Sequence, residues 1–377
     1  MKGKKRTIAT ALLAMLCMGV SAQQSETFSV ATLNVDGLPQ KILVINVNAD
    51  GPGAVGTARI GKYLTKKGYD IVCMQEDFNY HNVLIPWMED DYSNDTWSGD
   101  IGIEGRDIDF LHLQNHRFEC DGLCTFWKKD ITLESTERTA WKASFGKFSH
   151  ALDDIITKGF RRYEVTLANG LSLLVYNMHM DASDDKDELE GKDAKDKEAR
   201  QVQWQQLKDE ILSRIDTRPI IIMGDMNSFY GQDNVKAAFI DAINNSGKGT
   251  VSDVWVELQN KGLFPETKDD GISGGEVLDK ILYVNPSTGT QIKAVSMKLD
   301  KEGYLMDGKP LGDHYPLSAT FQVVGNESSS VTGVNGLMEA EQGDAEYYNL
   351  GGQRIGQPTK GLVIERQHQD NKKRIIK

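Results

Sequence analysis

The chain has 377 residues, of which 39% are hydrophobic and 26% are charged. This composition supports a large globular core and excludes collagen-like, low-complexity and wholly disordered chains. The formal charge of −12 argues mildly against a basic surface that binds nucleic acid without regard to sequence.

The N-terminal residues have the organisation of an export signal. A basic segment at residues 1–6 precedes an apolar run at residues 8–20, which is shorter than a membrane span. Small residues follow, and the last of them is Ala22. We therefore predict that residues 1–22 are a signal peptide, and that the mature protein is secreted, periplasmic or at the cell surface.

Short apolar and β-branched runs alternate with amphipathic stretches through most of the chain. The runs predict strands at residues 28–35, 70–75, 123–127, 163–167, 171–179, 219–224, 280–284 and 316–323. The amphipathic stretches predict helices at residues 58–67 and 195–215. Many strands and few helices favour a two-sheet α/β sandwich over a doubly wound Rossmann sheet.

Two local patterns support these elements. Asn169 and Gly170 tolerate a positive φ and predict a hairpin turn between two of the strands. In the second helix, a set of apolar residues at helical spacing predicts a stripe that packs on the core: Trp204, Leu207, Ile211 and Ile215.

Three cysteines remain after the predicted cleavage. Cys73 lies in an apolar run and is interpreted as a small buried hydrophobic side chain. Cys120 and Cys124 are close in sequence, and for an exported protein we expect a disulfide between them rather than two thiols. A zinc site is less favoured, because no second Cys or His pair with ligand spacing accompanies them.

The composition changes after residue 323. Residues 324–346 contain a stretch rich in Gly, Asn and Ser and are predicted to be a linker. Residues 347–377 resemble the short C-terminal tails that serve in sorting or surface attachment of secreted bacterial proteins. The predicted organisation is therefore a signal peptide, one main domain at residues 23–323, a linker and a tail.

Side chains that can carry chemistry gather at the ends of the predicted strands. Eight residues stand out in this way: Asn34, Glu76, His179, Asp225, Asn227, Asp279, Asp313 and His314. Each alone is explained by the solvation of a strand end or by a turn. The inference therefore depends on their joint occurrence.

Together these groups meet the needs of phosphodiester hydrolysis. The reaction requires a hard cation, a group that deprotonates water, and donors for the charge that develops on the phosphoryl oxygens. Carboxylate and amide oxygens suit Mg²⁺, with Mn²⁺ or Ca²⁺ as alternatives, and an imidazole suits proton transfer. The residues favour a metal-dependent phosphoric diester hydrolase.

The order of the motifs resembles the endonuclease/exonuclease/phosphatase superfamily, which includes deoxyribonucleases of the pancreatic type, inositol polyphosphate phosphatases and bacterial neutral sphingomyelinases. The motifs are TLNVDG, CMQE, YNMHMD, IIMGDMN, LDKIL and GDHYPL, and the resemblance covers about residues 28–323. The resemblance implies a four-layer α/β sandwich of two mostly antiparallel sheets flanked by helices.

The resemblance also implies roles for the metal and phosphate ligands. Glu76 is similar to the principal Mg²⁺ ligand of the family, with Asn34 beside it and Asp313 near the metal or its waters. Asp225 and Asn227 resemble the pair that orients the attacking water and binds the phosphoryl group.

The two histidines receive roles in the same way. His314 resembles the general base, and Asp279 resembles the carboxylate that fixes its tautomer. His179 is similar to the family histidine that donates to a phosphate oxygen.

The motifs predict the reaction and leave the substrate open. Export, and a segment at residues 153–160 that resembles one in sphingomyelinases, favour a sphingomyelinase or phospholipase C-like enzyme that acts on a phospholipid headgroup at a membrane surface. The alternatives are a secreted deoxyribonuclease-type nuclease acting on nucleic acid, an inositol polyphosphate phosphatase and, least favoured, a catalytically silent binding domain. We expect a monomer.

Two further groups of residues bear on the substrate. Arg161 and Arg162 are interpreted as contacting a phosphate, a headgroup or only water. The apolar residues within 78–87 either dock on a membrane or pack beneath their loop, and the sequence favours neither.

Overall fold

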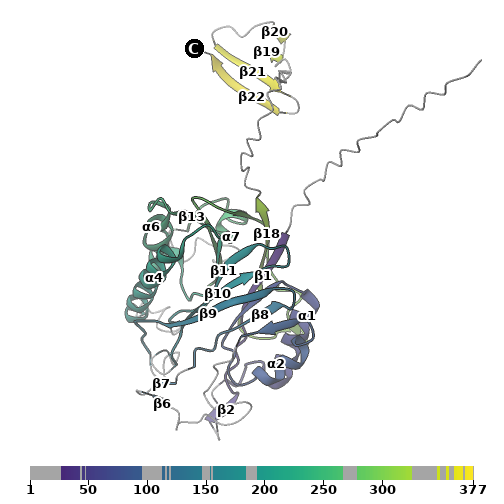
Figure 1. Ribbon diagram of the computed structural model, residues 1–377, viewed down its shortest axis with the longest axis vertical. Helices are drawn as coiled ribbons and strands as arrows, with labels where there is room; N and C mark the ends of the chain where they lie inside the picture. Colours follow the sequence, from purple (N-terminus) through teal and green to yellow (C-terminus); the bar gives the residue numbers. More distant parts are fainter. Residues whose placement is uncertain are drawn as a thin grey trace, which may run out of the picture. The chain divides into compact units, whose positions relative to one another are not determined.

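The computed structural model (Figure 1) describes residues 27–42, 45–46, 48–95, 113–114, 117–118, 120–146, 153, 156–183, 193–265 and 278–324, and four strands beyond residue 345. The predicted signal peptide and nearly all of the predicted linker lie outside these residues. None of the helices within the described ranges is long and apolar enough to cross a membrane. The chain divides into two compact units, Met1–Asn326 and Glu327–Lys377.

The first sheet of the larger unit has the strand order β15-β18-β1-β4-β8-β5. Its strands are β1 (Thr27–Asn34), β4 (Ile71–Gln75), β5 (Tyr92–Asn94), β8 (Cys124–Lys128), β15 (Gln291–Leu299) and β18 (Leu317–Val324). Strands β1 and β4 are parallel, and every other neighbouring pair is antiparallel.

The second sheet has the strand order β13-β14-β12-β11-β10-β9. Its strands are β9 (Thr132–Ala140), β10 (Gly159–Thr166), β11 (Ser172–His179), β12 (Ile220–Asp225), β13 (Gly249–Asp253) and β14 (Asp279–Pro286). Here the parallel pair is β11 and β12, and the other pairs are antiparallel.

The two sheets pack face to face, and helices cover their outer faces (Figure 1). On the first sheet lie α1 (Gly53–Lys67) and α2 (His81–Met88). On the second lie α4 (Ala194–Arg214), the short α5 (Tyr230–Asp233), α6 (Ala242–Asn244) and α7 (Val254–Leu258), and a π-helical segment, Lys236–Asp241. The predicted four-layer α/β sandwich of mostly antiparallel sheets is confirmed.

The central elements follow from their sequences. All six residues of β12 are buried, as expected for a continuous apolar run between two layers. Trp204, Leu207 and Ile211 of α4 are buried against the second sheet. Helix α1 ends where Gly68 adopts a left-handed conformation with φ 68°, which a glycine accommodates without a steric cost. The predicted turn at Gly170, with φ 85°, joins β10 to β11.

Four strands of the two large sheets do not appear among the predicted elements. Strand β9, TLESTERTA, is polar and mostly exposed because it forms an edge of the second sheet. Strands β5, β13 and β15 also occupy sheet edges. An edge strand buries little surface and so lacks the apolar pattern by which a strand is predicted.

The remaining strands of the described residues form four small sheets. In the larger unit β2 (Lys41–Ile42) pairs with β3 (Ile45–Asn46), β6 (Leu113–Gln114) with β7 (Arg117–Phe118), and β16 (Leu305–Met306) with β17 (Lys309–Pro310). The smaller unit contains a sheet of β19 (Glu346–Tyr348), β20 (Arg354–Ile355), β21 (Gly361–Gln367) and β22 (Asp370–Ile376), in the order β20-β19-β21-β22.

The cysteines differ from the prediction. Cys124 is a buried free thiol, so the predicted disulfide with Cys120 is wrong. Cys124 begins strand β8, and its side chain packs in the core between the first sheet and α1 and α2. Burial raises the pKa of its thiol well above the usual range. Cys73 is a buried side chain, as predicted.

Candidate functional site

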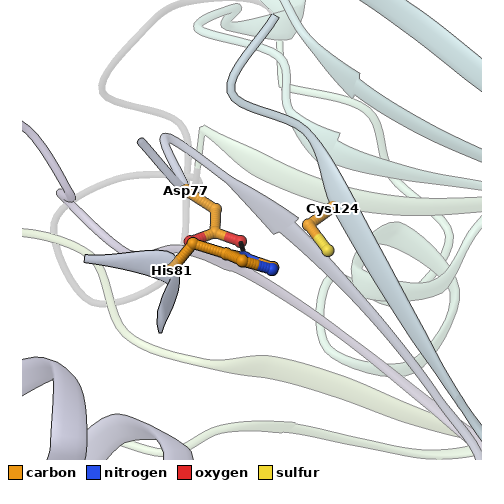
Figure 2. Close-up of side chains that lie close together, drawn as sticks. All are labelled: Asp77, His81 and Cys124. Atoms are coloured by element: carbon orange, nitrogen blue, oxygen red, sulfur yellow. Dashed lines mark hydrogen bonds and ion pairs between the residues drawn. The ribbon is translucent and has the colours of Figure 1, made fainter. Parts of the chain in front are cut away.

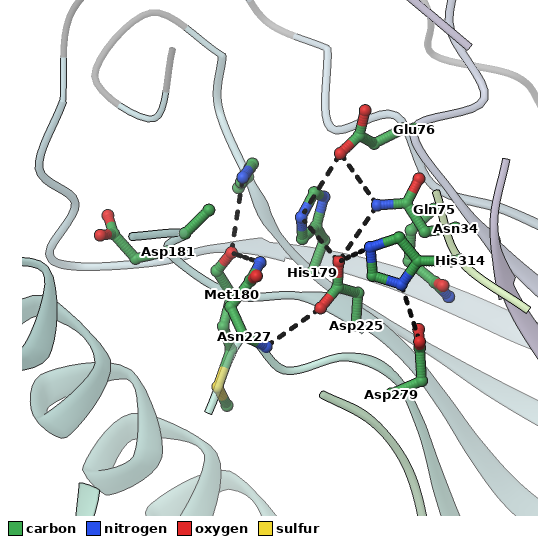
Figure 3. A network of polar contacts seen from close by, with 12 residues as sticks. Asn34, Gln75, Glu76, His179, Met180, Asp181, Asp225, Asn227, Asp279 and His314 are labelled. Atoms are coloured by element: carbon green, nitrogen blue, oxygen red, sulfur yellow. Dashed lines mark hydrogen bonds and ion pairs between the residues drawn. The ribbon is translucent and has the colours of Figure 1, made fainter. Parts of the chain in front are cut away.

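Seven of the eight predicted residues line one cleft of about 200 Å³: Asn34, Glu76, His179, Asp225, Asn227, Asp313 and His314. The eighth, Asp279, is hydrogen-bonded to His314 (Figure 3). Segments that are far apart in the sequence therefore converge on a single site.

The second sheet aligns three of these residues side by side. His179 ends β11 and pairs with Asp225, which ends the parallel strand β12. Asp225 pairs in turn with Asp279, the first residue of β14. Gly224 permits this close approach: its φ is 152°, and a Cβ there would lie 2.0 Å from the carbonyl oxygen of Met178.

Asn34 links the two sheets. It ends β1, beside Gln75 at the end of the parallel strand β4, and Glu76 follows directly. Its Nδ2 atom donates to Glu76 Oε1 at 2.9 Å and to Asp225 Oδ2 at 3.1 Å (Figure 3). Glu76 has a φ of 54°, a conformation that is uncommon for a residue other than glycine. The parallel pairs of both sheets thus end at the same site.

His314 lies between two carboxylates. Its Nδ1 is 2.7 Å from Asp279 Oδ2, and its Nε2 is 3.6 Å from Asp225 Oδ2. Burial opposes protonation of the ring, but Asp279 and Asp225 outweigh burial, so the pKa of His314 lies well above its usual range. Asp279 fixes which nitrogen faces Asp225.

His179 is in the opposite electrostatic state. Its side chain is fully buried, and burial, with Lys158 nearby, holds its pKa well below the usual range. Its Nε2 is 3.5 Å from Asp225 Oδ2 and 3.9 Å from Glu76 Oε1. The ring is therefore neutral at pH 7 and faces the carboxylates of both sheets.

Asp225 remains ionised between its neighbours. Burial opposes its ionisation, but His314 and His179 outweigh burial and hold its pKa below the usual range. Its Oδ1 accepts from the backbone N–H of Asn227 at 3.0 Å. The Asn227 side chain donates to the carbonyl oxygen of Met180 at 3.2 Å. Asn227 is thereby held at the edge of the cleft.

The structure adds two groups that the sequence analysis did not assign. Asp36 follows Asn34 closely, and burial together with Asp313 and Glu76 raises its pKa to about 7. Lys158 is buried and forms an ion pair with Asp153. Burial raises the pKa of Glu76, and the positive charge of Lys158 opposes part of this rise. The sequence could have identified Asp36 by its position within the motif TLNVDG.

This set of donors fits a hard divalent cation. Glu76, Asp313 and Asp36 bring carboxylates together, and Asn34 adds an amide oxygen, the donor types that Mg²⁺ prefers. The like charges raise the pKa of Asp36, so a cation among them would relieve their repulsion. The oxygen-rich set is unsuited to a soft metal.

The two arginines of interest do not line the cleft. Arg161 is buried and donates from Nε to Asp121 and from Nη1 to Asp95, both at 2.7 Å. Arg162 forms ion pairs with Glu137 and Glu164. Carboxylates of the chain therefore neutralise both guanidinium groups. Neither arginine needs the phosphate, headgroup or water contact that the sequence suggested.

The apolar segment after Glu76 mostly packs inward. Phe78 and Leu84 are buried, whereas Pro86 and Trp87 are exposed. The Trp87 ring lies 5.8 Å from Lys62 Nζ. Packing therefore explains most of the segment that was considered for membrane docking.

The sequence matches the model of the endonuclease/exonuclease/phosphatase family over residues 31–300. The chain belongs to the endonuclease/exonuclease/phosphatase family. It is therefore a metal-dependent phosphoric diester hydrolase, as predicted. Members of this family depend on a divalent metal and act on phosphate esters.

Solved structures share this fold. An endonuclease/exonuclease/phosphatase from Bacteroides vulgatus has a TM-score of 0.52 and 14% identity, with 80% of this chain and 100% of that chain covered. A humanised D. rerio TDP2 has a TM-score of 0.51 and 19% identity, with 78% and 98% covered. A Staphylococcus aureus beta toxin has a TM-score of 0.49 and 18% identity, with 78% and 99% covered. A search of the curated proteins found no match.

Proposed function

We propose that this family member is an exported, Mg²⁺-dependent phosphodiesterase of the sphingomyelinase or phospholipase C type. The observation that carries the proposal is the convergence of Glu76, Asp225 and the His314–Asp279 pair in one cleft. The motif resemblance and the predicted export signal support the choice of an external phospholipid headgroup. The C-terminal tail would then serve in sorting or surface attachment.

The side chains divide the chemistry among them. Mg²⁺ held by Glu76, Asn34 and Asp313 would polarise the phosphoryl group and favour ionisation of water. In its neutral form, His314 accepts the proton of the attacking water at Nε2, and the oxygen of that water forms the new bond to phosphorus. The bond to the leaving oxygen breaks, and that oxygen takes a proton from solvent.

The remaining groups position the substrate. Neutral His179 and the amide of Asn227 are donors that can bind the phosphoryl oxygens. Asp225, between the two histidines, orients the water. Asp279 accepts a hydrogen bond from Nδ1–H of His314, which leaves Nε2 directed toward the cleft.

The lining of the cleft favours a substrate with little charge beyond the phosphodiester. Arg200 is the one arginine or lysine among the described lining residues, and its Nε donates to Asp233 Oδ2 at 2.8 Å. Phe229 and Leu278 add apolar surface. A polynucleotide or an inositol polyphosphate gains its affinity from several cationic contacts, which this lining does not offer.

Replacing Asp279 with asparagine should lower kcat by about 100-fold and move the acidic limb of the kcat/KM profile to lower pH. Asp279 raises the pKa of His314, and the base must be neutral, so removing the carboxylate lets His314 lose its proton at lower pH. The measurement is a pH–rate profile of both proteins, with Asp241→Asn at an exposed ion pair as control. An unchanged limb would remove Asp279 from this role.

The substrate class is tested by assaying each candidate substrate separately. The mature protein with Mg²⁺ is given sphingomyelin vesicles, phosphatidylcholine vesicles, plasmid DNA or inositol polyphosphates, each with an EDTA control. We expect release of phosphocholine from one or both vesicles and intact plasmid. Nicking of plasmid alone would support a nuclease instead, and release of inorganic phosphate alone would support a phosphatase. Binding to one of these substrates without turnover of any would support a silent domain.

A further inference from the structure

A second group of metal-ligand side chains lies outside the cleft. Donor atoms of Asp77, His81 and Cys124 all lie within 4.8 Å of one another (Figure 2). Asp77 and His81 come from the segment that follows Glu76 and from the start of α2, and Cys124 begins β8. The cleft lining does not include any of them.

The three side chains are buried and held in place. Their exposed fractions are 2% for Asp77, 5% for His81 and 0% for Cys124. The backbone N–H of Asp77 donates to the carbonyl oxygen of Gly122 at 2.9 Å, which joins the two segments. His81 Nδ1 and Asp77 Oδ2 are 2.5 Å apart, and the nitrogen end of the ring points toward Cys124 in Figure 2.

We propose that Asp77, His81 and Cys124 bind a structural zinc ion. One thiolate, one imidazole and one carboxylate form a mixed donor set that suits zinc and is unsuited to Mg²⁺. The thiolate and the carboxylate together carry two negative charges, which match the charge of the ion. Donors around a tetrahedral zinc lie roughly 3–4 Å apart, so modest adjustment of the cluster accommodates the ion.

Binding exchanges a proton for the ion. Zinc would be held by the carboxylate of Asp77, an unprotonated ring nitrogen of His81 and the thiolate of Cys124, and the thiol proton of Cys124 goes to solvent. The fourth position of the tetrahedron would be taken by a water.

The same residue types also form nucleophilic Cys–His–Asp triads, but burial argues against that reading. A nucleophile must reach its substrate, and Cys124 has no exposed surface. A structural ion has no such need, because it is acquired as the chain folds. It would fasten the segment carrying Glu76 to strand β8, and so support the uncommon backbone conformation of Glu76.

The test uses cobalt as a spectroscopic substitute for zinc. The full chain is unfolded, refolded with Co²⁺ in excess Mg²⁺, and desalted. We expect one retained cobalt per chain and a thiolate-to-cobalt charge-transfer band in the near ultraviolet, which oxygen and nitrogen ligands alone do not produce. Cys124→Ser should abolish the band. Cys73→Ser, at a buried cysteine on the neighbouring strand, and Glu76→Gln, in the cleft, should both retain it.

A folded wild-type protein without the band, or a band that survives Cys124→Ser, would overturn the zinc site. Should Cys124→Ser fail to fold, His81→Asn keeps the thiol and should still reduce cobalt retention at least about tenfold. Zinc in the wild-type protein, purified without added metal and dialysed against Mg²⁺, gives an independent measure. A stoichiometric content supports the site, and a background content contradicts it.

Discussion

Replacing His314 with glutamine is expected to lower kcat by about 1,000- to 10,000-fold, with a much smaller change in KM. His314 is the imidazole whose Nδ1 is fixed by Asp279 at 2.7 Å and whose Nε2 faces Asp225 across the cleft. Glutamine preserves much of the volume and a polar contact with Asp279, but it cannot accept a proton at neutral pH. The loss should therefore fall on the chemical step.

Three measurements separate this role from a structural one. Circular dichroism and thermal unfolding should show a folded protein, and the Mg²⁺ dependence of thermal stability should remain, because His314 is not among the proposed metal ligands. Added imidazole should restore part of the activity of His314→Gln and have no effect on the wild type. If His314→Gln turned over substrate at the wild-type rate under saturating Mg²⁺, another group would have to accept the proton.

Replacing Glu76 with glutamine should raise the Mg²⁺ concentration needed for half-maximal activity by about 100-fold or more. Loss of a group that only supports a metal ligand already costs about 10- to 100-fold in affinity, and Glu76 is proposed to contact the ion itself. Glu89→Gln, at an exposed residue after α2, is the matched control. The measurement is a Mg²⁺ titration of activity, supported by calorimetry.

The same variant should be at least as stable as the wild type when no metal is present. Burial raises the pKa of Glu76 in the folded state, so its ionised form costs stability at pH values above its pKa in the unfolded chain. Glutamine removes that cost and still accepts the hydrogen bond from Asn34. Activity and stability should thus change in opposite directions. A lower melting temperature without metal, together with unchanged Mg²⁺ dependence, would show that Glu76 serves the fold.

The buried parts of the fold could be predicted because their sequences carry one strong pattern. Strand β12 is apolar up to its last residue, Asp225, and the stripe on α4 repeats at helical spacing. Strand β9 could not be predicted, because it lies at a sheet edge. Its polar sequence is that of side chains exposed to solvent and lacks the apolar pattern of a buried strand. Which strands are neighbours also depends on pairings across long stretches of chain.

The eight residues proposed for the site could be named because they occur in motifs whose order is typical of the family. Their separations could not be obtained from that order. The partners of Arg161 lie 40 and 66 positions away at Asp121 and Asp95, so no local spacing reveals that this arginine is neutralised. The contact of Cys124 with the segment after Glu76 is hidden for the same reason, which is why the disulfide prediction was wrong.

The two sheets differ in how their strands are ordered along the chain, and this difference has a consequence for biosynthesis. The second sheet is made of consecutive strands, whereas the first closes when β18 pairs with β1, Gln322 opposite Thr27. His314 lies shortly before β18, so the proposed proton acceptor joins the site only with the last strand of this sheet. We therefore expect a nascent chain on the ribosome to be inactive towards phosphodiesters until synthesis of this domain is complete.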